Sequence, residues 1–466
     1  MKKYLLSVLG VTMATLMACS DDSSSSPSGA DDTVIGSSDS VDPTNPATLS
    51  SASAIPDPGN GGENGGENGG NTTPVVDPGA STYYAVFPTP NQLAVQEMYN
   101  NWIAKFYVTY EEEVPASEEP YLGSIMVEKL KGSARIKFDA PLNTVSEGIG
   151  YGLLITYFMK DWEKFDRLFR YYKAYPVSEA DGLYFMKWMV KGDEFKGGFS
   201  PDATGGSATD ADLDVMTALF LAYGETGNTD YLTYAKGIAG AIYNTEVNAT
   251  THLFMPGNDG KHMNDGYVYN ISYFSLVALR LMIKYDTERS AAWQQVLDAT
   301  YDFMIKVQAA GNGLWPDWIN AEGVPTDPEN NSSTGKLNNF FGLEGVRIPL
   351  RVMWDYNWYG DDRAKTLAET AANFAYASTG GDITKTLIKY IYQGEQPTAG
   401  QGGAHFRGAF CSLWTVNATL SANTSACNDV ILATPFNATK TLYFEPSMQM
   451  LYTLFLNGYF VKYWNY

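Results

Sequence analysis

Residues 208 to 244 read A-T-D-A-D-L-D-V-M-T-A-L-F-L-A-Y-G-E-T-G-N-T-D-Y-L-T-Y-A-K-G-I-A-G-A-I-Y-N. Apolar residues recur at helical spacing on both sides of the turn E-T-G-N-T-D, 225 to 230. The pattern predicts one helix over 210–224 and a second over 231–244. Because the turn between them is short, the two helices form a hairpin.

Segments with the same spacing recur through the rest of the chain, and loops rich in Gly, Pro, Asn and Asp separate them. Strand-like alternation is rare. An α-solenoid would give a similar pattern, but no sequence repeat of fixed period is present. We therefore predict an all-α fold, a ring or stack of helical hairpins whose loops gather at one face and form a cleft. The further predicted helices are 273–285, 291–310, 363–377 and 448–463.

The first 82 residues differ in composition from the rest. Residues 1–19 combine two lysines, an apolar run and small residues before Cys19, which is typical of a secretory signal. The end of this run, L-M-A-C, resembles a bacterial lipobox, in which the cysteine is lipidated; an ordinary signal peptide cut nearby is the alternative. Residues 20–82 are rich in Ser, Gly, Asn and Pro and predict a disordered linker. The folded domain is expected over 83–466.

Charge and residue types narrow the function. The net charge of -21 without a basic cluster argues against nucleic acid as a partner. The three histidines lie apart without ligand spacing, so a catalytic zinc site is not expected. We expect no other metal and no organic cofactor either. Cys411 and Cys427 either pair as a disulfide in an exported protein or remain two buried thiols. The many aromatic residues suit core packing, and some of them suit stacking against sugar rings.

Three predicted loop-to-helix junctions, each flanked by glycine, carry acidic residues beside small residues. The first is Ser146-Glu147-Gly148, where Ser146 is expected to cap a helix and the glycines at 148, 150 and 152 allow something, such as a substrate, to approach the backbone. The second holds Asp210, Asp212 and Asp214, and the third holds Glu344 with Arg347 and Arg351. Any one of these acidic residues alone is better explained as a helix cap.

Spacing within these junctions suggests partners. Asp210 and Asp214 lie four residues apart on one helical face, where their repulsion requires compensation. Arg347 and Arg351 have the same spacing and are suitable partners. Three such junctions in one helical domain favour a shared site over three separate caps.

Paired carboxyl groups are what glycoside hydrolysis requires. One donates a proton to the leaving oxygen, and another acts on water or on the anomeric carbon. A helix N-terminus lowers the pKa of a carboxyl group, whereas a general acid needs a raised pKa. Glu147 therefore requires apolar burial or a nearby negative charge, for which Asp210 and Glu344 are candidates.

The segment A-T-D-A-D-L-D-V-M-T-A-L-F-L-A-Y closely resembles the signature of glycoside hydrolase family 8. Further pieces resemble the same family in the same order, and the resemblance runs from about residue 90 to the C-terminus. The combination of A-T-D-A-D with S-E-G-I-G-Y-G is specific. The pieces are V-S-E-G-I-G-Y-G (145–152), N-I-S-Y-F-S (270–275), L-W-P-D-W (314–318) and E-G-V-R-I-P-L-R (344–351).

The resemblance implies an (α/α)6 barrel with an open cleft and inverting hydrolysis of β-1,4 linkages, most often in cellulose or mixed β-glucan. It implies that Glu147 is the general acid and that Asp210 holds the sugar at the point of cleavage. Tyr273 and Ser207 would line the same subsite, and Trp188 would offer a stacking plane. Core packing is the alternative for Tyr273 and Trp188, and the better one for Trp315.

The predicted base departs from the family's pattern. Many members carry an aspartate at the position of Glu344, preceded by an aromatic residue, whereas Leu343 precedes it here. Glutamate is one methylene longer, so either the backbone retreats slightly or the base lies elsewhere. Arg347 matches an arginine that orients this carboxylate.

We therefore predict an exported, monomeric endo-β-1,4-glucanase that is held at the bacterial cell surface or outer membrane through Cys19, or else secreted. Its expected partner is a β-linked polysaccharide. Xylanase or chitosanase activity is the alternative within the family. A non-catalytic glycan-binding lipoprotein and a structural or adhesive surface protein are the rivals from other classes.

Overall fold

The computed structural model describes residues 83–111, 124–138, 143–178, 184–190, 206–258, 268–326, 339–396, 399–436 and 442–462. The predicted signal peptide (1–19), its Cys19 and the predicted linker (20–82) lie outside these residues. Among the helices that are described, none combines the length and apolar character needed to cross a bilayer.

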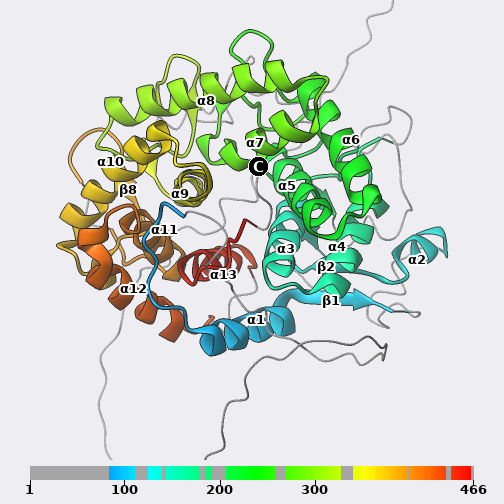
Figure 1. Ribbon diagram of the computed structural model, residues 1–466, viewed down its shortest axis with the longest axis horizontal. Coiled ribbons are helices and arrows are strands. Elements are labelled where there is room, and N and C mark those ends of the chain that lie inside the picture. The colour runs from blue at the N-terminus through cyan, green and yellow to red at the C-terminus, as the bar shows by residue number, and fades with distance from the viewer. Residues whose placement is uncertain are drawn as a thin grey trace, which may run out of the picture. The chain divides into compact units, whose positions relative to one another are not determined.

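Helices form two concentric layers in the described part of the chain (Figure 1). Consecutive inner helices contact one another, and the last inner helix contacts the first, so the inner ring closes. The inner helices are α3 (Ser146–Phe158), α5 (Thr209–Thr226), α7 (Leu276–Tyr285), α9 (Ile348–Tyr359), α11 (Ala404–Trp414) and α13 (Phe444–Leu456). The outer helices are α4 (Trp162–Ala174), α6 (Thr229–Thr245), α8 (Ser290–Ala310), α10 (Asp362–Thr379), α12 (Ser421–Ala433) and α1 (Gln92–Phe106). The predicted (α/α)6 barrel is confirmed.

The two layers differ in how their sequences bury apolar side chains. In the inner helix α3 every residue except Glu147 is buried, which matches its almost uniformly apolar sequence. The outer helix α4 buries one stripe that includes Phe165, Leu168 and Tyr172, at the spacing of a helix with one face in the core. This difference places the inner helices, and the polar residues at their ends, within the packed centre of the ring.

The turns that join the hairpins follow helix-capping rules. Helix α5 ends at Gly227, whose φ of 70° is left-handed, and Asn228 then caps α6 by accepting a hydrogen bond from the Asp230 amide. Gly360 and Asp361 repeat this arrangement between α9 and α10. The hairpin predicted from residues 208–244 is confirmed. The predicted helix 448–463 begins earlier, at Phe444, and ends at Leu456.

Short strands and helical turns connect the helices. The strands pair antiparallel in twos, and the pair β3–β4 lies directly before α3. The pairs are β1 (Tyr107–Tyr110) with β2 (Ser133–Ile136), β3 (Thr144–Val145) with β4 (Met189–Val190), β5 (Val268–Tyr269) with β6 (Ile319–Asn320), and β7 (Phe340–Phe341) with β8 (Tyr390–Ile391). The short helices are α2 (Ser124–Leu130), η4 (Ile271–Tyr273), η5 (Gly345–Arg347), η6 (Ile383–Lys385) and η7 (Ala418–Leu420).

The first and last helices together complete the ring, since α1 packs on α13 as its outer partner. Trp102 is fully buried in α1, and its indole N–H donates to Ser447 Oγ at 3.0 Å. The amide of Lys462 donates to the hydroxyl of Tyr83 at 3.2 Å. The two ends of the described chain therefore lie side by side.

Of the two possibilities for the cysteines, the structure has the buried thiols. Cys411 and Cys427 are both buried and unpaired as a disulfide. The Cys411 thiol donates to the carbonyl of Thr424 at 3.5 Å, and the Cys427 thiol donates to the carbonyl of Arg407 at 3.8 Å.

Candidate active site

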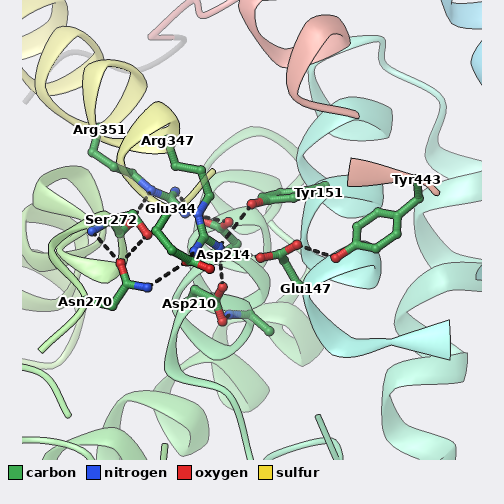
Figure 2. Close-up of polar contacts among 11 residues, drawn as sticks. Glu147, Tyr151, Asp210, Asp214, Asn270, Ser272, Glu344, Arg347, Arg351 and Tyr443 are labelled. Carbon is green, nitrogen blue, oxygen red and sulfur yellow. Dashed lines mark hydrogen bonds and ion pairs between the residues drawn. The ribbon is translucent and has the colours of Figure 1, made fainter. Parts of the chain in front are cut away.

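One arginine brings together the acidic residues of all three predicted junctions. Arg347 Nη1 donates to Glu147 Oε2 and, at 2.7 Å, to Asp210 Oδ2. Its Nη2 donates to Glu344 Oε2. Figure 2 shows the guanidinium between the three carboxylates, which come from α3, α5 and the turn before η5. Glu147 and Glu344 lie 197 positions apart in the sequence (344 − 147), so the predicted convergence is a property of the fold.

The acidic face of α5 is neutralised as its spacing predicts. Asp210 pairs with Arg347, and Asp214, one turn further on, pairs with Nη1 and Nη2 of Arg351. The two arginines are also four residues apart, so their spacing matches that of Asp210 and Asp214 on α5. Buried carboxylates with matched arginine partners avoid the cost of isolated buried charges.

The glycines at the start of α3 serve packing between protein groups. A Cβ on Gly150 would lie 3.1 Å from Cβ of Asp214, so the missing side chain lets α3 and α5 approach closely. A Cβ on Gly148 would lie 3.3 Å from the Tyr443 ring, and one on Gly152 would lie 2.9 Å from Leu168. The groups that approach this backbone are therefore neighbouring side chains, and the sequence-based suggestion of a substrate is wrong for these contacts.

Ser146 does not cap α3, contrary to the sequence-based expectation. The N-cap position is Val145, with no side-chain hydrogen bond, and Ser146 is already the first helical residue. Its hydroxyl is buried and finds no hydrogen-bond partner in the part of the chain that the structure describes. The turn is held through the backbone instead, since the Ser146 amide donates to the carbonyl of Trp188 at 2.9 Å.

Glu147 has the environment that a general acid requires. Burial raises the pKa of Glu147 to about 8, with Arg347 opposing the rise and the Asp210 carboxylate adding to it. The hydroxyl of Tyr443 donates to Glu147 Oε1 and also lowers the pKa. Burial and Asp210 thus outweigh Arg347 and the Tyr443 hydroxyl, and the pKa is raised, as a general acid requires. The Glu147 side chain keeps 15% of its surface exposed, so it stays within reach of a ligand.

Glu344 is held on a rigid turn. Besides Arg347, it accepts a hydrogen bond from Asn270 Nδ2 at 2.7 Å. Asp317 Oδ1 fixes the turn itself by accepting from the amides of Gly342 and Gly345, at 2.7 and 2.8 Å. The Glu344 side chain is 17% exposed, against 2% for Asp210. The two carboxyl groups predicted as acid and base are therefore the accessible members of the cluster.

Of the predicted substrate-binding residues, Arg347 and Tyr273 contact this cluster, whereas Ser207 and Trp188 contact neighbouring segments. The ring centre of Tyr273 lies 5.2 Å from the Arg347 guanidinium, and its edge meets Trp318, with ring centres 6.2 Å apart. Ser207 donates its hydroxyl to Glu246. Trp188 is half-buried and packs against the core, and its amide donates to the carbonyl of Gly206 at 2.9 Å, next to Ser207.

Trp315, for which core packing is expected, is fully buried, and its indole N–H donates to the carbonyl of Met304 at 3.0 Å. That expectation is confirmed.

Sequence reasoning missed three contacts of the site. Tyr443 touches Glu147 from 296 positions away, and nothing in its neighbourhood T-L-Y-F-E-P marks it as functional. Asn270 lies in the N-I-S-Y-F-S piece, where its position ahead of Tyr273 was the available signal. Trp318, half-exposed beside Tyr273, ends the L-W-P-D-W piece.

Metal ligands do not gather at this site. Among the described residues, no group of three His, Cys, Asp or Glu side chains is placed to hold a metal ion. What the cluster offers is two accessible carboxyl groups and one buried carboxylate around a single guanidinium. Such a set suits proton transfer to and from a bound ligand.

Comparison with known proteins gives a consistent result. The profile of the family described as "Glycosyl hydrolases family 8" matches residues 130–457. Endoglucanase 2 of Ruminiclostridium josui is 32% identical over 249 residues, which is 52% of this chain and 50% of that protein. The Beta-glucanase of Niallia circulans is 27% identical over 348 residues, 72% of this chain and 81% of that protein. The chain spans about half the length of the first of these relatives.

Solved structures share the fold. The apo structure of a beta-1,3-1,4-glucanase from Paenibacillus sp. X4 has a TM-score of 0.68 at 22% identity, covering 83% of this chain and 98% of that chain. Rex8A from Paenibacillus barcinonensis, complexed with xylose, has a TM-score of 0.62 at 17% identity, covering 82% and 98%. At these identities the likeness establishes the barrel.

Proposed function

Because the chain belongs to glycosyl hydrolase family 8, we propose that it is an inverting endo-glycosidase that cleaves β-1,4 linkages in cellulose or mixed-linkage β-glucan. The observation that carries the proposal is the contact of one guanidinium, that of Arg347, with Glu147, Asp210 and Glu344. The names of the relatives, endoglucanases and a beta-glucanase, support the choice of substrate.

Glu147 is the general acid. Its raised pKa keeps the carboxyl group protonated near neutral pH, so it has a proton to give to the glycosidic oxygen as the bond breaks. Arg347 and the Tyr443 hydroxyl both contact this carboxyl and stabilise the anion that is left after transfer.

Glu344 is the general base that takes a proton from the attacking water. Asn270 and Arg347 hold one of its oxygens, Oε2, and the carboxyl group is partly exposed. Asp210 is almost completely buried and fixed by Arg347, which suits a residue that positions the sugar with a hydrogen bond and does not itself transfer a proton. Inversion follows because water attacks the face opposite the leaving group.

The direct experiment replaces acid and base separately. Glu147→Gln and Glu344→Gln are each expected to reduce kcat on carboxymethylcellulose and mixed-linkage β-glucan by about two to four orders of magnitude. Glu163→Gln, at an exposed glutamate on α4, is the matched control and should retain activity. Near-normal turnover by either site variant would refute the role of that residue.

Two further assays test the substrate and the stereochemistry of the reaction. Reducing-end assays on cellulose, mixed β-glucan, xylan and chitosan separate the proposed glucanase from a xylanase or chitosanase. Tight glucan binding without release of reducing ends would instead identify a glycan-binding protein. Proton NMR of the first product should detect the α-anomer; the β-anomer would overturn the inverting mechanism.

For location, we propose that the protein is exported and anchored through a lipid on Cys19, with the segment 20–82 as a tether. The support is the sequence alone: a signal-like run that ends in L-M-A-C, followed by Ser, Gly and Asn residues. Metabolic labelling with a tagged fatty acid should mark the wild-type protein and leave Cys19→Ala unmarked. Equal labelling of both would refute the anchor.

A further inference from the structure

Asp212, the second acidic residue of α5, differs from its neighbours. Asp210 and Asp214 each face an arginine, whereas Asp212, which is completely buried, pairs with no arginine among the described residues. Asp212 Oδ1 accepts a hydrogen bond from the Tyr172 hydroxyl of α4. Its other oxygen, Oδ2, is buried without a hydrogen-bond donor among the described residues.

Glu246, the residue that follows α6, has the same deficit. It is also completely buried. Its Oε1 accepts the hydroxyl of Ser207, and its Oε2 finds no donor in the described part of the chain. The Asp212 and Glu246 carboxyl groups interact with each other, and burial raises the pKa of both, that of Asp212 well above its ordinary value.

The groups around this pair leave its charge uncompensated. Among the described residues, the titratable groups that act on it most strongly are the hydroxyls of Tyr172 and Tyr234, from α4 and α6, and the carboxylate of Asp210 on α5. None of these is a cation. Two ionised carboxylates in contact at a buried place repel each other strongly, and neither can donate to the other. A single proton satisfies both free oxygens with one short hydrogen bond.

We propose that Asp212 and Glu246 share one proton and act together as positioning residues, which hold Ser207 and the first turn of α5, and through that turn Asp210, at the active site. The link to Ser207 is direct, through its hydroxyl. Ser207 is further tied to Asn258, whose Oδ1 accepts from the Ser207 amide at 2.9 Å. The pair thus connects the end of α6 to the loop segment that leads into α5.

The start of α5 depends on such an outside support. Its N-cap, Ala208, offers no side-chain hydrogen bond, so the helix lacks the usual local cap. Thr209 instead donates its hydroxyl to the carbonyl of Met255 at 2.7 Å, in the segment that follows α6. Asp210 is the next residue, so a shift of this turn by a fraction of an ångström moves the carboxylate that Arg347 holds.

The shared proton has a signature that needs no substrate. At neutral pH the folded protein holds a proton that the unfolded chain, with ordinary carboxyl pKa values, has released. Stability must therefore fall as pH rises from ~5 to ~8, and the unfolding constant grows by up to about tenfold per pH unit from this pair. Glu147 adds a similar contribution, so the comparison has to be made between variants.

The test is urea unfolding between pH 5 and pH 8 of wild type, Asp212→Asn and Glu246→Gln. An amide donates permanently to the remaining carboxylate, so both variants should fold and should lose a pH dependence of about one proton. Glu163→Gln, at an exposed position, should keep the wild-type slope. An unchanged slope in both amide variants would overturn the shared proton. Loss of stability on chelator treatment, restored by calcium, would also overturn it by identifying a bound cation.

The positioning role rests on the proposed function and is tested by kinetics on β-glucan. Glu246→Ala, which releases Ser207, should lower kcat about ten- to a hundredfold, whereas Glu246→Gln, whose amide oxygen still accepts from Ser207, should restore most of it. Equal kcat in both variants would overturn the positioning role while leaving the shared proton standing. If wild type lacks activity on every polysaccharide, the proposed function fails, and the unfolding result remains valid.

Discussion

At the scale of single residues, Tyr443 is one of the groups that set how firmly Glu147 holds its proton. Burial raises the pKa of Glu147, and the hydrogen bond from the Tyr443 hydroxyl lowers it. The same tyrosine packs its ring over Gly148, so it enters the site through a space that only glycine leaves open. The pKa of the proposed acid is therefore a balance that one hydroxyl can shift.

Tyr443→Phe is expected to move the alkaline limb of the kcat/KM profile to higher pH by on the order of one unit. A general acid is active only while protonated, and without the hydroxyl the anion of Glu147 loses a donor, so its pKa rises. Tyr99→Phe, which removes a hydroxyl that donates to Asp161 at 2.8 Å, is the matched control and should leave the limb in place. A shift of the Tyr443→Phe limb to lower pH would contradict this balance.

The sequence could single out Glu147, Asp210 and Glu344 because each lies at a predicted helix start near small residues. The matched spacing of Arg347 and Arg351 pointed to them as partners of Asp210 and Asp214. Tyr443 and Asn270 could not be assigned, since their roles arise only when distant segments meet. The role predicted for Ser146 was wrong because the helix begins one residue earlier than expected. The role predicted for the glycines was wrong because a glycine indicates that some group comes close, and the sequence does not show which group.

At the scale of elements, the contact between α3 and α5 sets the distance between Glu147 and Asp210. Gly150 allows this contact, with the Asp214 Cβ only 3.1 Å from where its own Cβ would lie. Asp214 cannot yield easily because Arg351 holds both of its oxygens. The ion pair and the glycine together fix how the two helices pack.

Gly150→Ala is expected to destabilise the fold by about 1–3 kcal/mol, the range for an overpacked core, and to lower kcat as well. Gly240→Ala on α6 is the matched control, because its Cβ would meet only the flexible tip of Arg289. Alanine there should be neutral or stabilising by up to about 1 kcal/mol through helix propensity. Urea unfolding and β-glucan assays measure both effects; equal behaviour of the two variants would show that the α3–α5 contact is loose.

The positions of α5 and α6 were predictable to within two residues from apolar spacing and turn chemistry, whereas the predicted helix 448–463 ends seven residues too late. The 3₁₀ turn η5 was not predictable, although it holds Arg347. Its conformation depends on Asp317, more than twenty positions upstream, which accepts from two amides of the preceding turn. Local sequence does not encode such a support.

At the scale of the whole barrel, closure depends on α1 packing against α13. The Trp102–Ser447 hydrogen bond joins residues 345 positions apart, whereas contacts within hairpins such as α7–α8 are local. Contacts of such separation require most of the chain to be ordered first. Closure of the ring is therefore expected late in folding.

Trp102→Ala is expected to cost about 3–5 kcal/mol of stability, and mainly to accelerate unfolding. Trp293→Ala is the matched control: this tryptophan is equally buried, but its indole donates to Asp286 at 2.8 Å within one hairpin. The control should slow refolding more and accelerate unfolding less. Stopped-flow fluorescence in urea measures both rates, and a refolding defect confined to Trp102→Ala would mean that closure comes early.

Because Tyr83 and Lys462 are in contact, the folded barrel does not require the chain to begin at α1. A short peptide between these residues would turn the barrel into a circle, and the circle could be reopened at the exposed turn Gly227–Asn228, between α5 and α6, without cutting a helix. A circular permutant made in this way keeps every contact around Arg347, and it moves the point of attachment of any leader from α1 to α6.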